Sequence, residues 1–275
     1  MEKIVVAGAG GKMGTRLTNN LKKSIYETYY LEVSREGIER VRANGADISD
    51  PRKVIPDADY LILAVPDVSI KEVAHEYVPL LKPGAMSVSL DPAAPLAGAL
   101  PERKDISYFA THPSHPSVFN HEPDPEKHFD FFGGIAAKQT IICALIQGTE
   151  EDYRKGEKLA RILYSPVTVA HRVTLWQMGI LEPALSETFG AAIVSAMKDA
   201  IETAIEKGVP REAAYDFFFG HVNIELALVF GKLPGGKFSD AALKAINLGK
   251  KMILKEDWKK IFEAENVMEQ IKSIT

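Results

Sequence analysis

Short runs of β-branched and other apolar residues alternate with amphipathic segments through the first half of the 275-residue chain. This alternation is typical of a parallel sheet wrapped by helices. We expect strands at residues 3–7, 29–33, 60–65, 86–90, 108–110, 138–146 and 167–170. Apolar residues at helical spacing predict helices at residues 13–23, 38–44, 69–81 and 150–163, the last of them capped by Thr149. The predicted fold class of this half is α/β, with a doubly wound sheet.

The pattern changes after His171, where strand-like runs stop and apolar residues recur at steps of three and four. We therefore divide the chain into an α/β domain at residues 1–170 and an all-α domain at residues 171–275. The helices expected in the second domain span residues 174–207, 210–230, 239–254 and 255–271. The first would be about 50 Å long as one helix, and it is apolar on most faces around residues 184–197. Because one small domain hardly covers such a helix, we predict a homodimer.

The composition narrows the class of protein. Apolar residues make up 46% of the chain, which excludes a disordered or low-complexity protein. Lys and Arg number 33 against 37 Asp and Glu, and the net charge of -4 gives no general attraction to nucleic acid. The single cysteine, Cys143, excludes a disulfide framework. The sequence shows neither a signal-peptide pattern nor a membrane span, so we expect a cytoplasmic protein without a membrane or nucleic-acid partner.

A glycine-rich turn follows the first predicted strand and leads directly into a helix. Backbone N–H groups at such a helix start can bind a diphosphate, and glycines let the ligand approach the backbone closely. The spacing departs from the common G-x-G-x-x-G fingerprint, because Met13 stands at its sixth place. The flanking strand and helix nevertheless favour a Rossmann-type dinucleotide site over a purely structural turn. The residues that would form this site are Gly8, Gly10, Gly11, Lys12, Met13 and Gly14.

Two further positions fit a dinucleotide. Glu32 ends the second predicted strand, where a carboxylate accepts hydrogen bonds from an adenosine ribose and repels a 2′-phosphate, which favours NAD over NADP. Ser34 and Arg35 argue weakly for NADP. Ligands of open α/β sheets lie beyond the carboxyl ends of strands, so we place the nicotinamide side of the cofactor near Val65 and Asp67. Asp67 either contacts the cofactor or stabilises the N-terminus of its own helix.

Four of the seven histidines fall between residues 112 and 128. Prolines forbid a helix there, so we expect an extended loop at the edge of the sheet, from which His112 or His115 could point into a cleft. The alternative is that both are surface residues without a role. His121 and His128 lie among acidic residues and prolines and are interpreted as solvated loop residues.

The long helix of the second domain contains Glu182 next to Pro183, and a proline inside a helix costs about 3 kcal/mol. Glu182 would share a strip with Thr174, Met178 and Ser186, which are spaced from it in steps of four. A carboxylate together with a histidine suits a divalent metal ion with open positions, so His112 and Glu182 are our candidate ligands. A capped kink with a solvent-facing acid is the alternative.

A last group of polar residues, including His221 and Asn223, interrupts a helix that is otherwise apolar from residue 217 to 230. Buried polar groups need partners. Either a neighbouring helix or a substrate hydroxyl can provide them.

These motifs together resemble the 6-phosphogluconate dehydrogenase-like superfamily, and more narrowly the D-apionate oxidoisomerase family. The resemblance spans nearly the whole chain, and its specific motifs are His112-Pro113-Ser114-His115-Pro116 and Leu181-Glu182-Pro183. It departs from the wider superfamily at Thr174 and Met178, where hydroxyacid dehydrogenases carry a lysine and an asparagine that handle the substrate hydroxyl.

The resemblance implies an enzyme that oxidises a branched sugar acid with NAD and then shifts a carbon substituent, giving 3-oxo-isoapionate from D-apionate. It implies a catalytic set of Glu182, His115, His221 and Asn223, with one divalent metal ion of open identity held by His112 and Glu182. A simple NAD(P)-dependent hydroxyacid dehydrogenase without the shift is the first alternative. A nonenzymatic dinucleotide sensor is the second.

Overall fold

The computed structural model describes all 275 residues, and their contacts divide the chain into two compact units. The first unit comprises Met1–Pro183 and Val267–Thr275, and the second comprises Ala184–Asn266. The first unit therefore continues 13 residues past the predicted boundary at residue 170 and also takes in the end of the chain.

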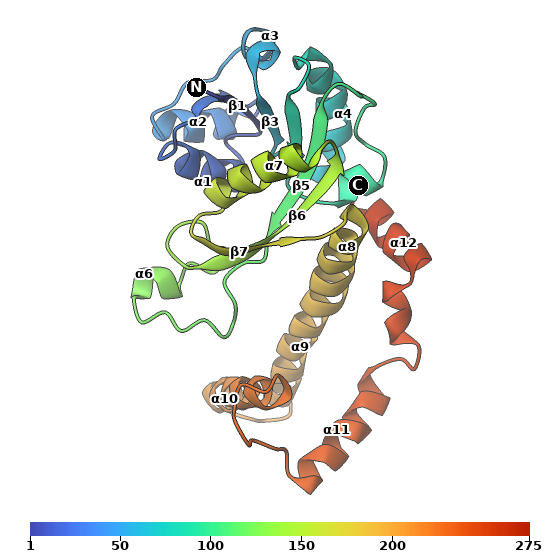
Figure 1. The fold of residues 1–275 in the computed structure, drawn as a ribbon. Helices are drawn as coiled ribbons and strands as arrows, with labels where there is room; N and C mark the ends of the chain where they lie inside the picture. The colour runs from blue at the N-terminus through green and yellow to red at the C-terminus, as the bar shows by residue number, and fades with distance from the viewer. The chain divides into compact units, whose positions relative to one another are not determined.

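A seven-stranded sheet forms the centre of the first unit, with strand order β2-β1-β3-β4-β5-β6-β7 (Figure 1). The strands are β1 (Lys3–Ala7), β2 (Glu27–Leu31), β3 (Tyr60–Leu63), β4 (Met86–Ser89), β5 (Ser107–Pro113), β6 (Gln139–Gln147) and β7 (Val167–Arg172). The first five strands pair in parallel, as predicted. β6 runs antiparallel to β5, because a loop with a single short helix joins them instead of a crossover helix.

Helices pack on both faces of this sheet. Those of the first unit are α1 (Lys12–Leu21), α2 (Arg35–Ala43), α3 (Pro51–Val54), α4 (Asp67–Tyr77), α5 (Ala93–Leu96), α6 (Pro125–His128), α7 (Glu150–Leu163), α8 (Leu175–Gly179) and α12 (Ala264–Ile274). Two 3-10 helices, η1 (Ile55–Asp57) and η2 (Val78–Leu80), lie between them in the chain. Successive residues of a strand point to opposite faces. In β1, Ile4 joins a core cluster with Leu17 of α1, whereas Val5 joins a second cluster with Ile70 of α4. The doubly wound, Rossmann-type α/β fold is thus confirmed.

Helix α7 shows how local sequence fixes an element. Thr149 accepts a hydrogen bond from the backbone N–H of Asp152, whose carboxylate accepts one from the backbone N–H of Thr149, so the predicted cap is confirmed as a capping box. Gly156 then lets the helix approach the sheet, because a Cβ atom there would lie 2.5 Å from the ring of Phe109.

The second unit is helical, as predicted. It contains α9 (Ala192–Glu206), α10 (Arg211–Val229), α11 (Asp240–Ile253) and the 3-10 helix η4 (Trp258–Phe262). The boundary between the units falls inside η3 (Ile180–Ala191), a π-helix that joins α8 to α9 along the chain. No helix of either unit combines the length and the apolarity that crossing a bilayer requires.

The helix predicted at residues 255–271 is wrong. The chain forms η4, becomes extended at Glu263 and starts α12 at Ala264. The apolar residues of the two segments pack in different places, since Trp258 stacks on Phe189 whereas Val267 and Ile271 are fully buried in the first unit. The helical spacing of apolar residues continues across a break that only tertiary packing decides.

Candidate active site

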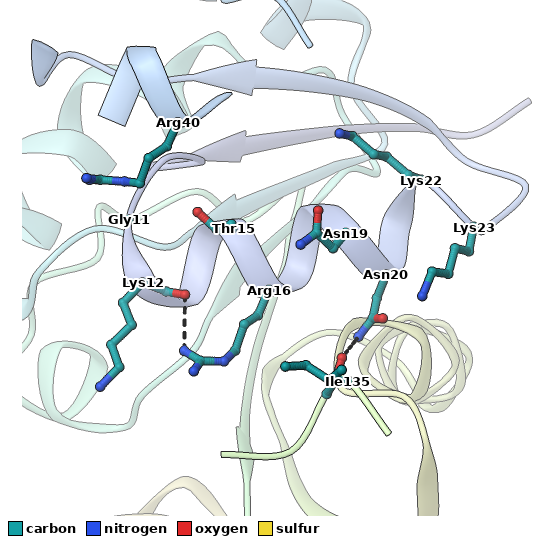
Figure 2. A pocket seen from close by; sticks show the side chains of 11 residues that line it. Gly11, Lys12, Thr15, Arg16, Asn19, Asn20, Lys22, Lys23, Arg40 and Ile135 are labelled. Carbon is teal, nitrogen blue, oxygen red and sulfur yellow. Dashed lines mark hydrogen bonds between the residues drawn. The ribbon is translucent and has the colours of Figure 1, made fainter. Parts of the chain in front are cut away.

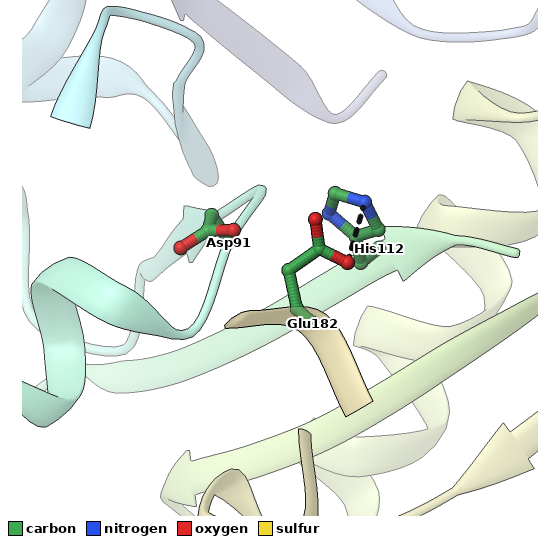
Figure 3. A group of neighbouring side chains, drawn as sticks. All are labelled: Asp91, His112 and Glu182. Atoms are coloured by element: carbon green, nitrogen blue, oxygen red, sulfur yellow. Dashed lines mark ion pairs between the residues drawn. The ribbon is translucent and has the colours of Figure 1, made fainter. Parts of the chain in front are cut away.

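Three side chains of the first unit converge at the carboxyl ends of the central strands (Figure 3). One ligand atom from each of Asp91, His112 and Glu182 lies within 4.8 Å of the corresponding atoms of the other two. Two oxygen ligands on opposite sides of a calcium ion lie about 4.8 Å apart, twice a typical Ca–O distance. The three residues are therefore close enough to hold one divalent ion.

Each member of this group is placed by its own element. Asp91 stands two residues after β4, where its carboxylate accepts a 2.6 Å hydrogen bond from the backbone N–H of Ala93 at the start of α5. Glu182 follows α8, which Met178 anchors in a buried cluster with Ala110 and Ala144. Glu182 therefore sits on rigidly packed backbone.

His112 lies within β5 and not in a loop, so this part of the prediction is wrong. β5 runs to Pro113 because it pairs with β6 beyond Ala110, where its pairing with β4 has already ended. A proline is tolerated there, since the β4 side of the strand has no partner at that point. The strand that extends β5 was predicted at residues 138–146, but its antiparallel pairing with β5 was not.

A backbone hydrogen bond determines which nitrogen of His112 faces the carboxylates. Nδ1 lies 2.8 Å from the carbonyl oxygen of Leu90, and because a carbonyl can only accept, Nδ1 carries the proton. Nε2 is thereby left to face Glu182, whose Oε2 lies 3.4 Å away. Metal-binding histidines typically donate their other ring N–H to a carbonyl or carboxylate in this way.

The pKa of Asp91 shows most clearly that this site lacks positive charge. The pKa of Asp91 is raised to about 7, mainly by burial and also by the neighbouring carboxylates of Asp67 and Glu182, against the opposing effects of the Ala93 N–H and His112. Asp67, the first residue of α4, has its own pKa raised by burial and by Glu182, against the opposing effects of its own backbone N–H and His112. The carboxyl groups of Asp67, Asp91 and Glu182 therefore lie near one another with the imidazole of His112 among them.

Asp91 was not among the predicted site residues. The signal was present, since an aspartate directly after a buried strand of an open α/β sheet lies at the ligand-binding edge. Neighbouring parallel strands β3 and β4 place Asp67 and Asp91 at the same edge.

The glycine turn has the geometry of a dinucleotide-binding loop. Gly8 has a φ of +81°, a conformation that other residues rarely adopt. A Cβ atom on Gly14 would lie 2.0 Å from the carbonyl oxygen of Gly8, and one on Gly10 would lie 2.2 Å from that of Gly37 in α2. Gly11 begins α1 without a side-chain cap, so its neighbours' N–H groups face outward.

Beside this turn lies a basic groove of about 900 Å³ along the outer side of α1 (Figure 2). The cations that line it are Lys12, Arg16, Lys22, Lys23 and Arg40. Arg40 also donates a 2.6 Å hydrogen bond to the carbonyl oxygen of Gly10. Met13 packs partly buried against the core and therefore holds the helix in place, whereas Val65 lies against Gly8.

Glu32 lies at this turn, one residue after β2. Its Oε2 accepts a hydrogen bond from the N–H of Gly10, and its Oε1 accepts from the N–H groups of Val33 and Ser34 and from the Ser34 hydroxyl. Burial alone would raise the pKa of Glu32, but these hydrogen bonds outweigh it and the pKa is lowered. Glu32 is therefore ionised at neutral pH and supports the backbone of the turn.

His115 stands beside the metal-ligand group in an unusual backbone conformation. Its φ is +59°, its ring meets that of His112 edge-on with centroids 6.1 Å apart, and its Nδ1 lies 2.9 Å from the carbonyl oxygen of Phe132. The carbonyl again places the proton on Nδ1 and leaves Nε2 as the acceptor. His115 also borders a polar pocket of about 330 Å³ that includes His121, Lys138 and Thr140.

The predicted strip on the long helix is wrong except for Glu182. Thr174 is occupied as the N-cap of α8, where it accepts from the N–H of Gln177, and Met178 is fully buried. The π-helix η3 has a wider turn than an α-helix, so steps of four no longer align Ser186 with Glu182. This wider turn is also how the chain accommodates Pro183.

His221 and Asn223 lie on α10 of the second unit and are exposed. Nδ1 of His221 lies 2.8 Å from the carbonyl oxygen of Phe217 in the same helix, and the two rings stack 4.0 Å apart. The expectation that these polar groups are buried within the chain is therefore wrong, and their role at the substrate stays a prediction.

A Rossmann-type sheet with a glycine turn and a carboxylate–histidine group at its strand ends defines a dinucleotide-binding oxidoreductase.

The comparisons with known proteins agree with this class. Residues 120–275 match the family model described as phosphogluconate dehydrogenase (decarboxylating) C-term. The chain is 46% identical to the D-apionate oxidoisomerase of Cupriavidus necator over 275 residues, covering 100% of this chain and 99% of that protein. It is 45% identical to the D-apionate oxidoisomerase of Rhizobium rhizogenes, with both chains fully covered.

A solved structure from Cupriavidus necator is also similar, with a TM-score of 0.97, 46% identity and both chains fully covered. That protein is described as a semialdehyde dehydrogenase NAD-binding protein in complex with calcium and NAD. The chain belongs to the D-apionate oxidoisomerase family.

The three-residue group predicts that a divalent ion stabilises the folded protein. Calcium should raise the melting temperature, because an ion that binds only the folded state adds about 2.7 kcal/mol at a hundredfold excess over its Kd. The Asp91→Asn variant should lose most of this shift, whereas Asp67→Asn, which changes a neighbouring acid outside the group, should keep it. The measurement is a calcium titration followed by differential scanning calorimetry. An equal shift in wild type and Asp91→Asn would contradict the assignment.

Proposed function

We propose that this protein is an NAD-dependent oxidoisomerase acting on D-apionate or a closely related branched sugar acid. One observation carries the proposal: Asp91, His112 and Glu182 form a metal-ligand group in the same unit as a glycine turn shaped for a dinucleotide. The relatives named D-apionate oxidoisomerase and the similar structure with calcium and NAD support it.

The donor set fits a divalent metal ion, because two carboxylates and an imidazole face one another and the half-buried Asp91 has no neighbouring Lys or Arg among the groups that shift its pKa. An ion held by Asp91, His112 and Glu182 would supply a positive charge that lowers the pKa of a substrate hydroxyl and polarises a carbonyl. Oxygen-rich sites suit hard cations, and calcium or magnesium is favoured on that ground.

NAD would accept the hydride, and the residues around the glycine turn would hold it. The N–H groups of Gly10 and Gly11 are bonded to Glu32 and Gly8 and shape the turn, so the first turn of α1 and the ammonium group of Lys12 would face the diphosphate. Glu32 lies one residue after β2, where its negative charge would disfavour a 2′-phosphate on an adenosine ribose. Val65 and Asp67 lie after β3, toward the nicotinamide side.

Removing a hydride from a secondary alcohol also requires removing the hydroxyl proton. His115 is our candidate acceptor, because its Nδ1–H is bound to a carbonyl and its Nε2 is the ring's acceptor. The adjacent tertiary hydroxyl must lose its proton before a carbon substituent migrates to the newly formed ketone, so a base is needed twice. We retain His221 and Asn223 as predicted contacts of the substrate hydroxyls.

A simple NAD(P)-dependent hydroxyacid dehydrogenase is the second candidate function, because it needs the same cofactor unit and the same three ligands. Analysing the product by mass and NMR separates the two, since only the oxidoisomerase gives a rearranged skeleton. A dinucleotide sensor would bind NAD without oxidising any sugar acid.

Glu182→Gln should lower kcat for NADH formation from D-apionate by at least about a hundredfold, because a metal ligand and its charge are lost from the transition state. The Kd for NAD should stay within about twofold, since the dinucleotide is held elsewhere. Steady-state kinetics and a fluorescence titration with NADH test both values, with the exposed Glu76→Gln as the matched control. Unchanged turnover would remove Glu182 from the metal site.

Glu32→Gln keeps the shape of the side chain but removes its charge. The ratio of kcat/KM for NAD over NADP should fall by about tenfold, because repulsion of the 2′-phosphate disappears. Glu36→Gln, which neutralises an exposed acid in the first turn of α2, should leave the ratio unchanged. A constant ratio in Glu32→Gln would show that another residue selects the cofactor.

We also propose that the protein is a homodimer that works in the cytoplasm. The second unit leaves many large apolar side chains exposed, and only Ala214 of the 19-residue α10 is buried. Such a helix needs cover from outside the chain. The most exposed of these side chains are Phe217, Met252 and Ile253.

Light scattering should therefore give about twice the 30.2 kDa of one chain. Ile253→Glu should shift the mass toward one chain, because a charge would have to enter the interface. Ile25→Glu, at an equally exposed apolar residue of the first unit, should not. A single-chain mass for the wild-type protein would contradict the proposal.

A further inference from the structure

Phe132 contacts both α1, the helix that follows the glycine turn, and His115, which follows β5. The roles assigned above to the metal-ligand group and the glycine turn do not explain these contacts. The residue is 40% exposed, yet two cations of α1 lie over its ring: Nζ of Lys12 is 3.8 Å and the guanidinium carbon of Arg16 is 4.4 Å from the ring centroid. Its backbone carbonyl accepts the hydrogen bond from His115. One residue thus contacts both parts of the site.

The contact with His115 has three components. The Phe132 carbonyl selects the ring tautomer, and the Phe132 ring meets the imidazole edge-on with centroids 5.6 Å apart. The backbone of His115 has a φ of +59°, a conformation that persists in a non-glycine residue only where surrounding contacts enforce it. The segment around Phe132 provides such a contact.

The contact with α1 reaches the dinucleotide turn. Lys12 directly follows Gly11, and both line the same basic groove. A cation is attracted to the face of an aromatic ring. The Phe132 ring therefore keeps the ammonium group of Lys12 at the turn before any ligand arrives, which lowers the side-chain entropy lost when a diphosphate binds.

We propose that Phe132 is a positioning residue that couples dinucleotide binding at the glycine turn to the placement of His115. Lys12 and Arg16 hold the ring, the ring fixes the backbone of residue 132, and its carbonyl fixes the imidazole. Binding linkage is reciprocal, so a loop held in place by α1 also favours the dinucleotide. This inference rests on the proposed function, in which Lys12 contacts NAD and His115 accepts the substrate proton.

Substitution of the ring separates this role from simple packing. Phe132→Leu keeps apolar bulk but loses the aromatic face, so the Kd for NAD should rise about threefold or more and kcat should fall about tenfold. Phe132→Trp keeps the face and should restore both values to within about twofold of wild type. Phe131→Leu, the neighbouring aromatic that contacts Phe129 instead, is the matched control and should change neither. Equal damage in Phe132→Leu and Phe132→Trp would overturn the proposal.

Two double-variant cycles test the coupling directly. In a Lys12→Met background, Phe132→Leu should add less than about twofold to the Kd for NADH, because the cation that the ring holds is already gone. In a His115→Ala background, Phe132→Leu should lower kcat no further. Fully additive effects in both cycles would overturn the coupling. The NADH titration needs no substrate, so a wild-type protein that oxidises no sugar acid would contradict the proposed function while the first cycle still reports on Phe132.

Discussion

Repulsion between closely placed carboxylates is the constraint on which the site depends. Asp91, Glu182 and Asp67 share a partly desolvated corner with the single imidazole of His112, and the cost appears as the raised pKa of Asp91. Burying acids that lack a positive partner destabilises a fold. The chain nevertheless fixes them there with packed backbone: a buried methionine anchors the helix before Glu182, and an Ala93 N–H holds Asp91. A divalent cation is the partner that converts this arrangement from a cost into a binding site.

The two histidines of the site share one orienting device. His112 and His115 each direct Nδ1 to a backbone carbonyl, those of Leu90 and Phe132. Each ring therefore presents Nε2 as its acceptor, one toward Glu182 and the other as a base for a substrate proton. Backbone carbonyls are placed by the fold and not by rotamers, so both tautomers are set before substrate binds. The same residue types on a free loop would have no such preference.

Much of the fold follows from the sequence, as do the dinucleotide turn and two of the three metal-ligand candidates, His112 and Glu182. Periodicity identified the doubly wound sheet, the helical second unit and the α7 cap, and a glycine turn between strand and helix located the dinucleotide loop. Periodicity could not show that β6 reverses direction and thereby lengthens β5 through His112, because that depends on pairing between distant segments. It also could not show that Pro183 is accommodated in a π-helix, so a strip drawn at steps of four was wrong for Ser186. The position of Asp91 directly after a buried strand was a signal in the sequence, but its pairing with Glu182, about ninety residues away along the chain, depends on the fold.

Helix α8, which precedes Glu182, carries no ionisable side chain. The hydroxyl of Thr174 caps this helix, and Met178 within it is fully buried. Neither can hold or move a proton at a substrate hydroxyl. Asp91 and Glu182 therefore have only His112 to offset their charge, and a divalent ion held by these residues would polarise two neighbouring substrate oxygens at once. A carbon shift after the oxidation would use that double polarisation, because the new carbonyl oxygen and the neighbouring alkoxide both carry negative charge as the substituent migrates.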